Sequence, residues 1–568
     1  MKNPEVAAVL YDIADILELQ GVEFKPQAYR KAARSIEELS EDIEDLAKKG
    51  TLQTIPGVGE SIGKKLKELI ETGKLSYYER LKKQLPKHIF ELMQVPGLGP
   101  KKIKFLNEKL GIGSVDELEE AAKKGKIKEL AGFGEKSEGE ILKGIELLKG
   151  AKQRMLLGHA LPIAQEIEQR LKNLKEVNEV SLAGSLRRRK ETIGDIDILV
   201  SSKKPSKVMD FFTTMPDVRQ VLAKGPTKSS VIVSNNLQVD LRVIDKNFGA
   251  ALVYFTGSKE HNIVMRDIAI RKGLKINEYG VFTRQGSRLV AGKTEEDVYK
   301  SIGMKCMPPE IRENSGEIEA AMKNRLPKLV GYDEIRGDLH IHTSHTDGKN
   351  TVQEMVMATK KIGYEYVCIS DHSKSDRIAN GNTEEELLEE IKEVRSAEKK
   401  IGGIRVFAGA EVSILGNGEL DFSDELLKKL DIVVASVHSG FKSSKEQMTK
   451  RIISALENEH VDILGHPTGR LIYKREPYEV DLNRIFKSAA ENDVLLEINS
   501  QPDRMDLKDV YVRDAKNLGC KFAIDTDAHS INGLNYMQLG IAVARRGWLG
   551  KEDVANTMTL KELKWFLK

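Results

Sequence analysis

Residues 183–200 read AGSLRRRKETIGDIDILV, a Gly-Ser pair followed by four basic residues in a row and by two aspartates one residue apart. If its end is a strand, Asp195 and Asp197 lie on one face and the isoleucine between them on the other. Two neighbouring carboxylates repel each other unless a cation lies between them, and a divalent metal ion is the usual partner. Gly184 and Ser185 add a closely approachable backbone and a hydroxyl group, both suited to phosphate. The stretch therefore predicts a site for a nucleoside triphosphate and metal ions. The alternative is a surface turn followed by a strand with exposed acids.

Charge is unevenly distributed along the 568 residues, a length that predicts several domains. Residues 1–150 carry 26 basic and 26 acidic side chains, residues 151–330 carry 31 and 21, and residues 331–568 carry 33 and 40. A basic middle part is typical of a protein that binds nucleotides or nucleic acids. An acidic last part is expected if its carboxylates and histidines bind cations.

The composition is that of a soluble globular protein. No apolar run approaches the roughly 20 residues that span a bilayer, and no secretory signal opens the chain, so we expect no membrane association. The three cysteines are scattered, which fits a reducing cytoplasm and predicts no disulfide framework.

Three similar glycine turns interrupt the almost wholly helical residues 1–150. They are IPGVGESIGKKL (55–66), VPGLGPKKIKFL (95–106) and AGFGEKSEGEIL (131–142), each with glycines two apart before a new helix. This pattern is typical of the helix-hairpin-helix, whose turn presents backbone N–H groups at a helix N-terminus to a DNA phosphate. Plain glycine helix caps would explain one such turn, but three favour DNA binding. The expected DNA contacts in the first two turns are Gly57, Gly59, Gly97 and Gly99.

Residues 151–330 mix strands and helices, and a third acid joins the first two there. The segment VIVSNNLQVDLRVI (231–244) predicts a β-hairpin that turns at Asn235-Asn236. Asp240 alternates with apolar residues in its second strand, a pattern that a merely exposed position would also give. Beside the two earlier aspartates, it is interpreted as the third carboxylate of one site.

Residues 333–568 alternate strands and helices, with polar or ionisable residues where each strand ends. The seven strand candidates are GDLHIH (337–342), YVCISDH (366–372), VFAGAEV (406–412), IVVASVH (432–438), DILGHP (462–467), LLEINS (495–500) and FAIDTDAH (522–529). Seven such units, with their reactive side chains at strand C-termini, predict a (β/α)7-type barrel whose site lies on its C-terminal face.

These motifs resemble two known families. GS…GDIDILV, QVDLRV, LVYFTGS and INEY occur in the order of the family X DNA polymerases and with nearly their spacing, and residues 333–568 look like a PHP (polymerase and histidinol phosphatase) domain. The chain is thus similar to the bacterial and archaeal family X polymerases that carry a PHP domain. The resemblance implies a multidomain fold with α-helical N-terminal domains, an α+β nucleotidyltransferase palm and the barrel. The implied limits are 1–82 (lyase-like helical domain), 83–150 (helical DNA-binding subdomain), 151–246 (palm), 247–316 (nucleotide- and template-binding subdomain), 317–332 (linker) and 333–568 (PHP domain).

For the polymerase site, the resemblance implies that Asp195, Asp197 and Asp240 hold two Mg²⁺ ions, or Mn²⁺ in their place. Asp240 also matches the carboxylate that helps to take up the proton of the primer 3′-hydroxyl group. Arg266 matches a residue on the template side. The implied nucleotide-binding positions are Gly184, Ser185, Arg188, Gly194, Tyr254, Phe255, Gly257 and Asn262.

Lys65 follows the first glycine turn at the offset where the family has a lysine that forms a Schiff base with an abasic sugar. Such a nucleophile needs a lowered pKa, which the adjacent Lys64 could promote. Ser61 and Glu71 occupy positions near which some relatives have lysines for a 5′-phosphate. The alternative is a pair of phosphate-contacting lysines without lyase activity.

Nine residues match the metal-ligand positions of the PHP domain one by one, and eight of them lie near the ends of six strand candidates. They are His340, His342, Asp347, His372, Glu411, His438, His466, Asp527 and His529. Imidazoles favour Zn²⁺ or Mn²⁺ and a carboxylate such as Glu411 can bridge two ions, so up to three ions are implied. Such a site would activate water to attack a phosphodiester. His345 breaks the ligand pattern, and His88, His159 and His261 are interpreted as ordinary core or surface histidines.

The resemblance implies a template-directed DNA polymerase that fills gaps in base excision repair, as a monomer acting on gapped or nicked double-stranded DNA with dNTPs. The PHP domain implies 3′→5′ exonuclease activity and suggests AP-endonuclease activity as a further one. The alternatives are a template-independent nucleotidyltransferase, a PHP domain that is a phosphomonoesterase or only structural, and a DNA-bound scaffold with both sites inactive. The glycine turns, YFTGS and Arg266 speak against the first, and the complete ligand sets speak against the last.

Overall fold

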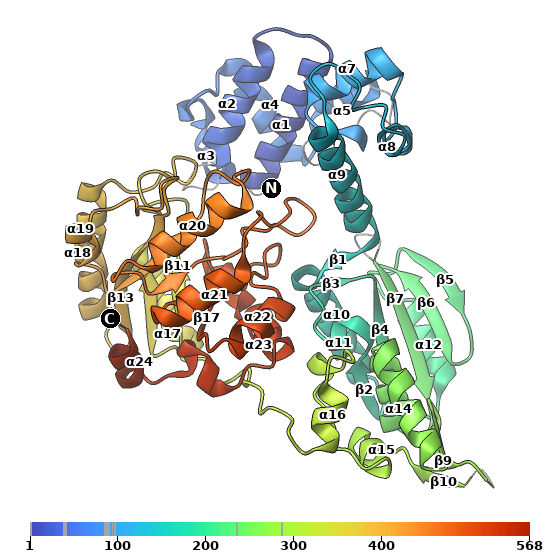
Figure 1. Ribbon diagram of the computed structural model, residues 1–568. Helices are drawn as coiled ribbons and strands as arrows, with labels where there is room; N and C mark the ends of the chain where they lie inside the picture. The colour runs from blue at the N-terminus through green and yellow to red at the C-terminus, as the bar shows by residue number, and fades with distance from the viewer. Residues whose placement is uncertain are drawn as a thin grey trace.

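The computed structural model shows three groups of elements (Figure 1): the N-terminal helices, a mixed sheet with its helices, and a barrel of parallel strands. None of the helices in the described parts of the chain is long and apolar enough to cross a bilayer. The described residues are 3–37, 43–84, 91–93, 95, 98–233, 237–285 and 288–567.

The N-terminal helices form around two separate apolar cores. The first joins α1 (Asn3–Leu19), α2 (Lys25–Glu37), α3 (Ile43–Lys49), α4 (Glu60–Thr72) and α5 (Ser76–Gln84). The second joins α7 (Pro100–Leu110), α8 (Val115–Lys123) and α9 (Glu135–Gln153). Val6, Leu10, Ile13 and Ile16 are all fully buried on one side of α1, which is the pattern of an amphipathic helix.

The three glycine turns share one backbone geometry. In each, the residue between the two glycines donates its N–H to the carbonyl three residues earlier, and the second glycine directly precedes α4, α7 or α9. Each helix therefore begins with its free N–H groups beside the turn. The three bonds are Val58 to Ile55 (3.0 Å), Leu98 to Val95 (3.1 Å) and Phe133 to Leu130 (3.0 Å).

The predicted DNA-contact glycines occupy these turns as far as they are described. Gly57 has a φ of 83°, and a Cβ there would lie 3.2 Å from the backbone nitrogen of Ala32, so glycine is required. Gly59 and Gly99 have open space where a Cβ would be, as expected for backbone that faces outward. Gly97 lies outside the described residues.

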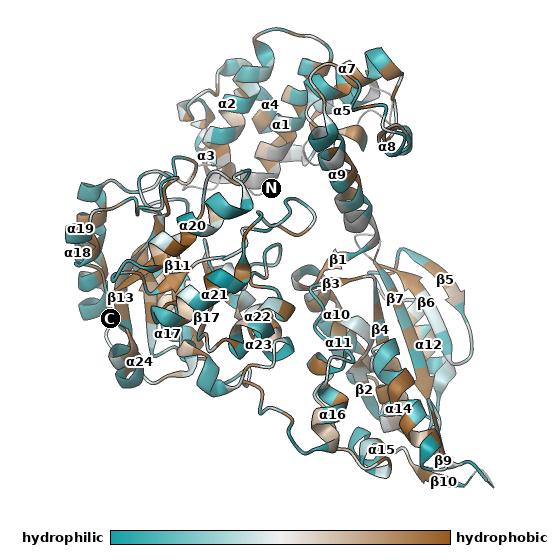
Figure 2. Cartoon of the chain, viewed as in Figure 1, coloured by the Kyte–Doolittle hydropathy of each residue, from teal (hydrophilic) through white to brown (hydrophobic). Residues whose placement is uncertain are grey.

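The middle of the chain forms a five-stranded sheet in the order β2-β4-β7-β6-β5, with α10 (Leu157–Lys172), α11 (Gly184–Arg187) and α12 (Pro205–Thr213). The strands are β2 (Glu179–Leu182), β4 (Asp195–Ser201), β5 (Gln220–Lys224), β6 (Lys228–Ile232) and β7 (Gln238–Ile244), beside a small pair of β1 (Met155–Leu156) and β3 (Thr192–Ile193). The antiparallel β6–β7 pair confirms the predicted hairpin, whose turn residues 234–236 lie outside the described residues. Figure 2 shows apolar residues along these central strands.

The next segment adds helices and a small antiparallel sheet around its own apolar core. The predicted linker begins with a helix, α16 (Glu317–Met322), whose Ile318 and Ala321 are buried in this core. The elements are α13 (Phe248–Thr256), α14 (Lys259–Arg271), β8 (Leu274–Asn277), β9 (Gly280–Thr283), β10 (Leu289–Ala291), α15 (Glu295–Ser301) and α16 (Glu317–Met322).

The C-terminal part is the predicted barrel of seven parallel strands in sequence order. The first and last strands approach each other through the bridge between Ile341 and Ala528, which nearly closes the barrel. The strands are β11 (Gly337–Ile341), β12 (Tyr366–Ile369), β13 (Arg405–Ser413), β14 (Ile432–Ser436), β15 (Ile463–Leu464), β16 (Leu495–Asn499) and β17 (Phe522–Asp525). The helices include α17 (Val352–Ile362), α18 (Glu384–Ile401), α19 (Asp424–Leu427), α20 (Lys445–Leu456), α21 (Leu482–Glu491), α22 (Asp509–Asn517), α23 (Met537–Arg546) and α24 (Leu560–Phe566).

Candidate metal and nucleotide sites

The three predicted carboxylates of the middle sheet lie on two adjacent parallel strands. β4 and β7 place Asp195 beside Gln238 and Asp197 directly beside Asp240. Burial, and then repulsion from Asp195 and Asp240, raises the pKa of Asp197 to about 7. The protein alone therefore does not neutralise the negative charge of these three aspartates. A bound divalent cation would neutralise it.

Asp240 has more hydrogen-bond donors around it than Asp197. Its Oδ2 lies 2.9 Å from Lys228 Nζ, and its Oδ1 accepts a hydrogen bond of 2.9 Å from Gln238 Nε2. Burial alone would raise the pKa of Asp240, but these hydrogen bonds lower it below its usual value. Asp240 is therefore ionised at neutral pH, as a metal ligand must be.

The predicted Gly-Ser turn folds directly against Asp197. Gly184 has a φ of 60°, and a Cβ there would lie 2.2 Å from Asp197 Oδ2, so only glycine fits. Ser185 directly follows this glycine in the first turn of α11. Gly194 precedes β4 and lies against Arg154, whose Nη1 would be 3.2 Å from a Cβ at that position.

Arg188, a predicted triphosphate contact, is held from two sides. Its Nε donates to Glu313 Oε1 at 3.0 Å and its Nη1 to the carbonyl of Thr256 at 2.5 Å. Gly257 is the next residue, and a Cβ there would lie 3.2 Å from Arg188 Nη1. The guanidinium group is therefore fixed where the predicted nucleotide-binding residues near α11 meet those at the end of α13.

The other predicted nucleotide positions lie where α13 ends and α14 begins. Asn262 Nδ2 donates to the carbonyl of Tyr254 at 2.8 Å, and the rings of Tyr254 and Phe255 meet edge to face at 5.1 Å. The Phe255 ring lies 4.6 Å from the guanidinium carbon of Arg242, which is two residues beyond the third carboxylate on β7. Tyr254 is 38% exposed, and Arg266 is exposed on α14, so both can meet a ligand.

Lys65 lies on α4 among aromatic side chains from two other helices. Its Nζ is 4.9 Å from the ring centroid of Tyr77 and 5.9 Å from that of Tyr29, and the two rings stack at 6.4 Å. The ammonium group also donates to the Ser61 hydroxyl at 2.8 Å and to the Ser61 carbonyl at 3.1 Å. Cation–π contacts and hydrogen bonds thus fix the amine beside the first glycine turn.

The cation that perturbs Lys65 is not the one suggested by the sequence. Burial, followed by repulsion from Lys25, lowers the pKa of Lys65. The adjacent Lys64 instead forms an exposed ion pair of 2.7 Å with Glu60, one helical turn away. Lys25 lies at the start of α2, so its proximity depends on helix packing and was invisible in the sequence.

All nine residues predicted as PHP ligands come together at one end of the barrel. Their strands end there, and Glu411 lies at the centre: its Oε1 is 2.9 Å from His466 Nε2 and 3.1 Å from His438 Nε2, while its Oε2 is 2.8 Å from His372 Nδ1. Four groups have ligand atoms within 4.8 Å of one another: His342, Asp347, His372 and His529; His340, His342 and Asp527; His372, Asp376 and His438; and Glu411, His438 and His466.

The donor set fits divalent cations. The buried Nδ1 atoms of His342 and His466 have no hydrogen-bond partner among the described residues, and such orphaned atoms are costly unless something binds them. Imidazole nitrogens and carboxylate oxygens in this number are the ligands of Zn²⁺ and Mn²⁺. Asp347 and His529 are about one third exposed, so the site is reached from their side.

Without cations, protons neutralise part of this cluster. Burial alone would lower the pKa of His529, but Asp347 and Asp527 raise it to about 10. Glu411 and Asp347 likewise overcome burial and raise the pKa of His372 to about 9. Protons on these histidines therefore compete with metal ions for the same carboxylate-rich space.

Three acids around the ligands were missed in the sequence. Glu497 Oε1 lies 2.7 Å from His340 Nδ1, and Asp371 Oδ1 lies 3.8 Å from His342 Nδ1. Glu497 belongs to β16, the one strand without a predicted ligand, and a carboxylate inside the apolar LLEINS was the available signal. Asp376 lies on a loop after β12, where no strand-end pattern indicates it.

The histidines that were not predicted as ligands have other surroundings. His261 is fully buried, with Nδ1 2.7 Å from Glu317 Oε1 and Nε2 3.0 Å from the Tyr299 hydroxyl, which confirms an ordinary core histidine. His345 Nε2 lies 2.9 Å from Glu393 Oε2 and belongs to none of the four ligand groups. His159 is exposed on α10, and His88 lies outside the described residues.

Known protein families match most of the chain. Residues 160–278 match the DNA polymerase beta palm and residues 251–313 the DNA polymerase beta thumb. Residues 338–501 match the PHP domain. In the N-terminal part, residues 1–75 match a helix-hairpin-helix domain and residues 89–146 a SAM-like helix-hairpin-helix tandem, as the glycine turns predicted.

Relatives fall into two groups. The DNA polymerase/3'-5' exonuclease PolX of Bacillus subtilis (strain 168) is 38% identical over 572 aligned positions, which cover 100% of both chains. A probable phosphatase of Thermoanaerobacter sp. (strain X514) is 30% identical over 243 residues, 41% of this chain and 94% of that protein. A probable phosphatase of Caldanaerobacter subterraneus subsp. tengcongensis is 30% identical over 242 residues, 41% of this chain and 90% of that protein. The chain therefore belongs to the family X DNA polymerases that carry a C-terminal PHP domain.

Proposed function

We propose that this protein is a template-directed DNA polymerase that fills gaps during base excision repair. The observation that carries the proposal is the cluster of Asp195, Asp197 and Asp240 on adjacent strands, with the glycine-serine turn folded against it. Helix-hairpin-helix turns on the N-terminal helices support a grip on DNA phosphates without sequence reading. Gapped or nicked duplex and dNTPs are its substrates, and the protein acts as a monomer.

Each part of the chain has its own role in this proposal. Residues 1–82 and 83–150 hold DNA, residues 151–246 form the catalytic palm, and residues 247–316 bind the nucleotide and the template. Residues 317–332 join them to the PHP domain, residues 333–568. The three free thiols support a reducing cytoplasm as its location.

Divalent cations are required at both sites. Asp195, Asp197 and Asp240 would hold two Mg²⁺ or Mn²⁺ ions, which supply charge neutralisation for the triphosphate and activation of the primer hydroxyl group. Around them, Gly184 lets the chain approach Asp197, and Ser185 and Arg188 bind phosphate oxygens. Tyr254, Phe255, Gly257 and Asn262 line the nucleotide, and Arg266 contacts the template strand.

The barrel is proposed to remove nucleotides from DNA 3′ ends and to incise DNA at abasic sites. Its nine ligands would hold up to three Zn²⁺ or Mn²⁺ ions, whose chemistry is the activation of water toward a phosphodiester. Glu411 contacts three of the histidines and would be shared between ions. The partly exposed side formed by Asp347 and His529 gives the substrate access.

The two probable phosphatases favour a second candidate for the barrel, hydrolysis of phosphomonoesters. A labelled duplex with a recessed 3′ end and a separate 3′-phosphorylated duplex distinguish the two activities. We expect Mn²⁺-dependent release of 3′ nucleotides from the first duplex. Release of phosphate alone, with the DNA chain left intact, would replace the exonuclease by the phosphomonoesterase.

Lys65 is proposed as the nucleophile of an abasic-site lyase, supported by its lowered pKa and its place beside two stacked tyrosine rings. Borohydride reduction should trap the wild-type protein on a 5′-deoxyribose phosphate end. Lys65→Ala should abolish trapping and Lys64→Ala should retain it. Equal trapping by both variants would leave these lysines as phosphate contacts only.

Template dependence is tested with a one-nucleotide gap whose template base is varied among all four bases. We expect the incorporated dNTP to follow the template base in every case. Incorporation that ignores the template would identify a template-independent nucleotidyltransferase instead. Asp195→Ala with Asp197→Ala is the control for a contaminating polymerase.

A further inference from the structure

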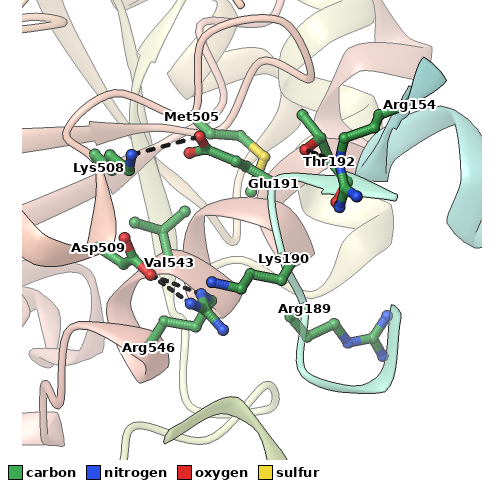
Figure 3. A pocket seen from close by; sticks show the side chains of 10 residues that line it. All are labelled: Arg154, Arg189, Lys190, Glu191, Thr192, Met505, Lys508, Asp509, Val543 and Arg546. Atoms are coloured by element: carbon green, nitrogen blue, oxygen red, sulfur yellow. Dashed lines mark hydrogen bonds and ion pairs between the residues drawn. The ribbon is translucent and has the colours of Figure 1, made fainter. Parts of the chain in front are cut away.

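The PHP barrel packs directly on the palm, close to the nucleotide site. A Cβ on Gly158 of α10 would lie 2.7 Å from Pro502 of the barrel, so the two surfaces touch without room for a methyl group. A cavity of about 190 Å³ is lined by residues of both parts (Figure 3). Residues 189–192 line it from the palm, and Asp509 and Arg546 line it from helices α22 and α23 of the barrel.

Two consecutive arginines at the end of α23 reach from the barrel to the polymerase part. Both contact Glu310, Arg545 at its carboxylate and Arg546 at its carbonyl (3.1 Å), but only Arg546 also reaches Arg188. Arg545 Nε donates to Glu310 Oε1 and its Nη1 to the carbonyl of Val330, both at 2.7 Å. Arg546 is only 5% exposed, and Asp509 fixes it within the barrel through contacts of 2.8 Å to Nε and 2.6 Å to Nη2 (Figure 3). Such a charge-assisted pair holds the guanidinium plane in one orientation.

The oriented Arg546 reaches Arg188 in two ways. Its Nη1 donates to the backbone carbonyl of Arg188 at 2.7 Å. The same atom lies 3.0 Å from Glu313 Oε1, the carboxylate oxygen that accepts from Arg188 Nε at 3.0 Å. The backbone of Arg188 and the acid that orients its side chain are therefore both fixed from the PHP domain.

Arg188 keeps donors available in this position. Only its Nε and Nη1 are hydrogen bonded, and no residue in the described part of the chain accepts a hydrogen bond from Nη2. Burial alone would raise the pKa of Glu313, but Arg188, Arg546 and Lys190 lower it, so its charge persists at neutral pH. A guanidinium fixed along one edge and open along the other is suited to a phosphate oxygen.

We propose that Arg546 is a positioning residue of the polymerase, which orients Arg188 toward the triphosphate of the incoming dNTP through Glu313 and the Arg188 carbonyl. The inference rests on the proposed function, because it needs a dNTP at the palm. The PHP domain then contributes to nucleotide binding through its surface, independently of its own metal site.

The test compares Arg546→Gln with Arg545→Gln in the full-length protein. Both variants lose an arginine that joins the two domains, but only Arg546 contacts Arg188. At saturating gapped DNA, Arg546→Gln should raise the KM for dNTP about tenfold with kcat within about twofold, since one charge-assisted network is lost. Arg545→Gln should leave this KM within about twofold. Arg546→Lys should give an intermediate KM, because an ammonium group cannot make all of these contacts.

Asp509→Asn provides a second variant if Arg546→Gln does not fold. It leaves the arginine in place but weakens its orientation, so the KM for dNTP should rise in the same direction by a smaller factor. An unchanged KM in a folded Arg546→Gln protein, or equal increases for Arg545→Gln and Arg546→Gln, would overturn the inference. Full incorporation by Asp195→Ala with Asp197→Ala would instead refute the proposed polymerase site.

Discussion

Asp197 and Asp240 lie directly opposite each other on the adjacent parallel strands β4 and β7. The pair differs in charge environment: the pKa of Asp197 is raised to about 7 and that of Asp240 is lowered. The negative charge of Asp197 is therefore not compensated by the protein, while that of Asp240 is compensated by Lys228 and by a hydrogen bond from Gln238. This asymmetry gives the polymerase site a pH dependence that can be measured.

Asp197→Asn should stabilise the metal-free protein above neutral pH. Because the folded pKa of about 7 exceeds the ordinary value of 3.8, ionised Asp197 destabilises the metal-free fold, partly above pH 4 and fully above pH 7. Asparagine removes this penalty, so the metal-free variant should melt about 2 °C or more above wild type at pH 8. The advantage should disappear near pH 4, and nucleotide incorporation should be lost at every pH. Calorimetric scans with EDTA from pH 4 to 8 measure it, and a pH-independent difference would contradict the assigned pKa.

Gly184→Ala tests the packing of the turn against the carboxylates. The new methyl group would lie 2.2 Å from Asp197 Oδ2 at a positive φ, so the turn must move. Displacement of about 1 Å at a reacting centre costs roughly 100-fold, which is the expected loss in dNTP incorporation. Gly416→Ala is the control, because a Cβ at Gly416 meets open space. Equal activities of the two variants would show that the turn takes no part in the site.

Metal binding by the PHP site should release protons and strengthen as pH rises. His372 and His529, with pKa values of about 9 and about 10 in the metal-free protein, are protonated at neutral pH and must lose those protons to bind a cation. Calorimetric titration of Mn²⁺ at pH 7 in buffers of different ionisation enthalpy should report proton release. Affinity should increase between pH 6 and 9. A pH-independent affinity without proton release would contradict these protonation states.

Glu411→Gln should separate the two activities. The carboxylate contacts three histidine ligands, so its amide should reduce bound metal and lower 3′ nucleotide release by about 100-fold. Incorporation of dNTPs should stay within about twofold of wild type. Metal content by mass spectrometry and both activity assays measure this. Glu419→Gln, which changes a loop residue bonded to Asn417, is the matched control.

The sequence predicted those features that depend on the spacing of residues within one strand or one turn. Asp195, Asp197 and Asp240 stand out because acids in an apolar strand have few ordinary reasons to be there. The PHP ligands stand out because parallel strands end at one face of a barrel. The same local logic identified the glycine turns, whose conformation depends on residues three apart.

Features that depend on packing between distant segments could not be predicted in this way. Lys25 approaches Lys65 only because α2 and α4 share a core. Glu313 lies between Arg188 and Arg546, which are 358 residues apart in the chain, and no local pattern connects them. Asp376 joins the metal cluster from a loop, where side-chain direction follows from the folded backbone alone.

We propose that this one chain carries two separate metal-dependent centres, one that adds nucleotides and one that removes them. The most direct measurement follows a labelled primer in a gapped duplex with dNTPs and Mn²⁺, and in a parallel reaction without dNTPs. Wild type should extend the primer in the first reaction and shorten it in the second. Asp195→Ala with Asp197→Ala should only shorten it, and His342→Ala should only extend it. Loss of both activities in either variant, or retention of both in both variants, would contradict the account.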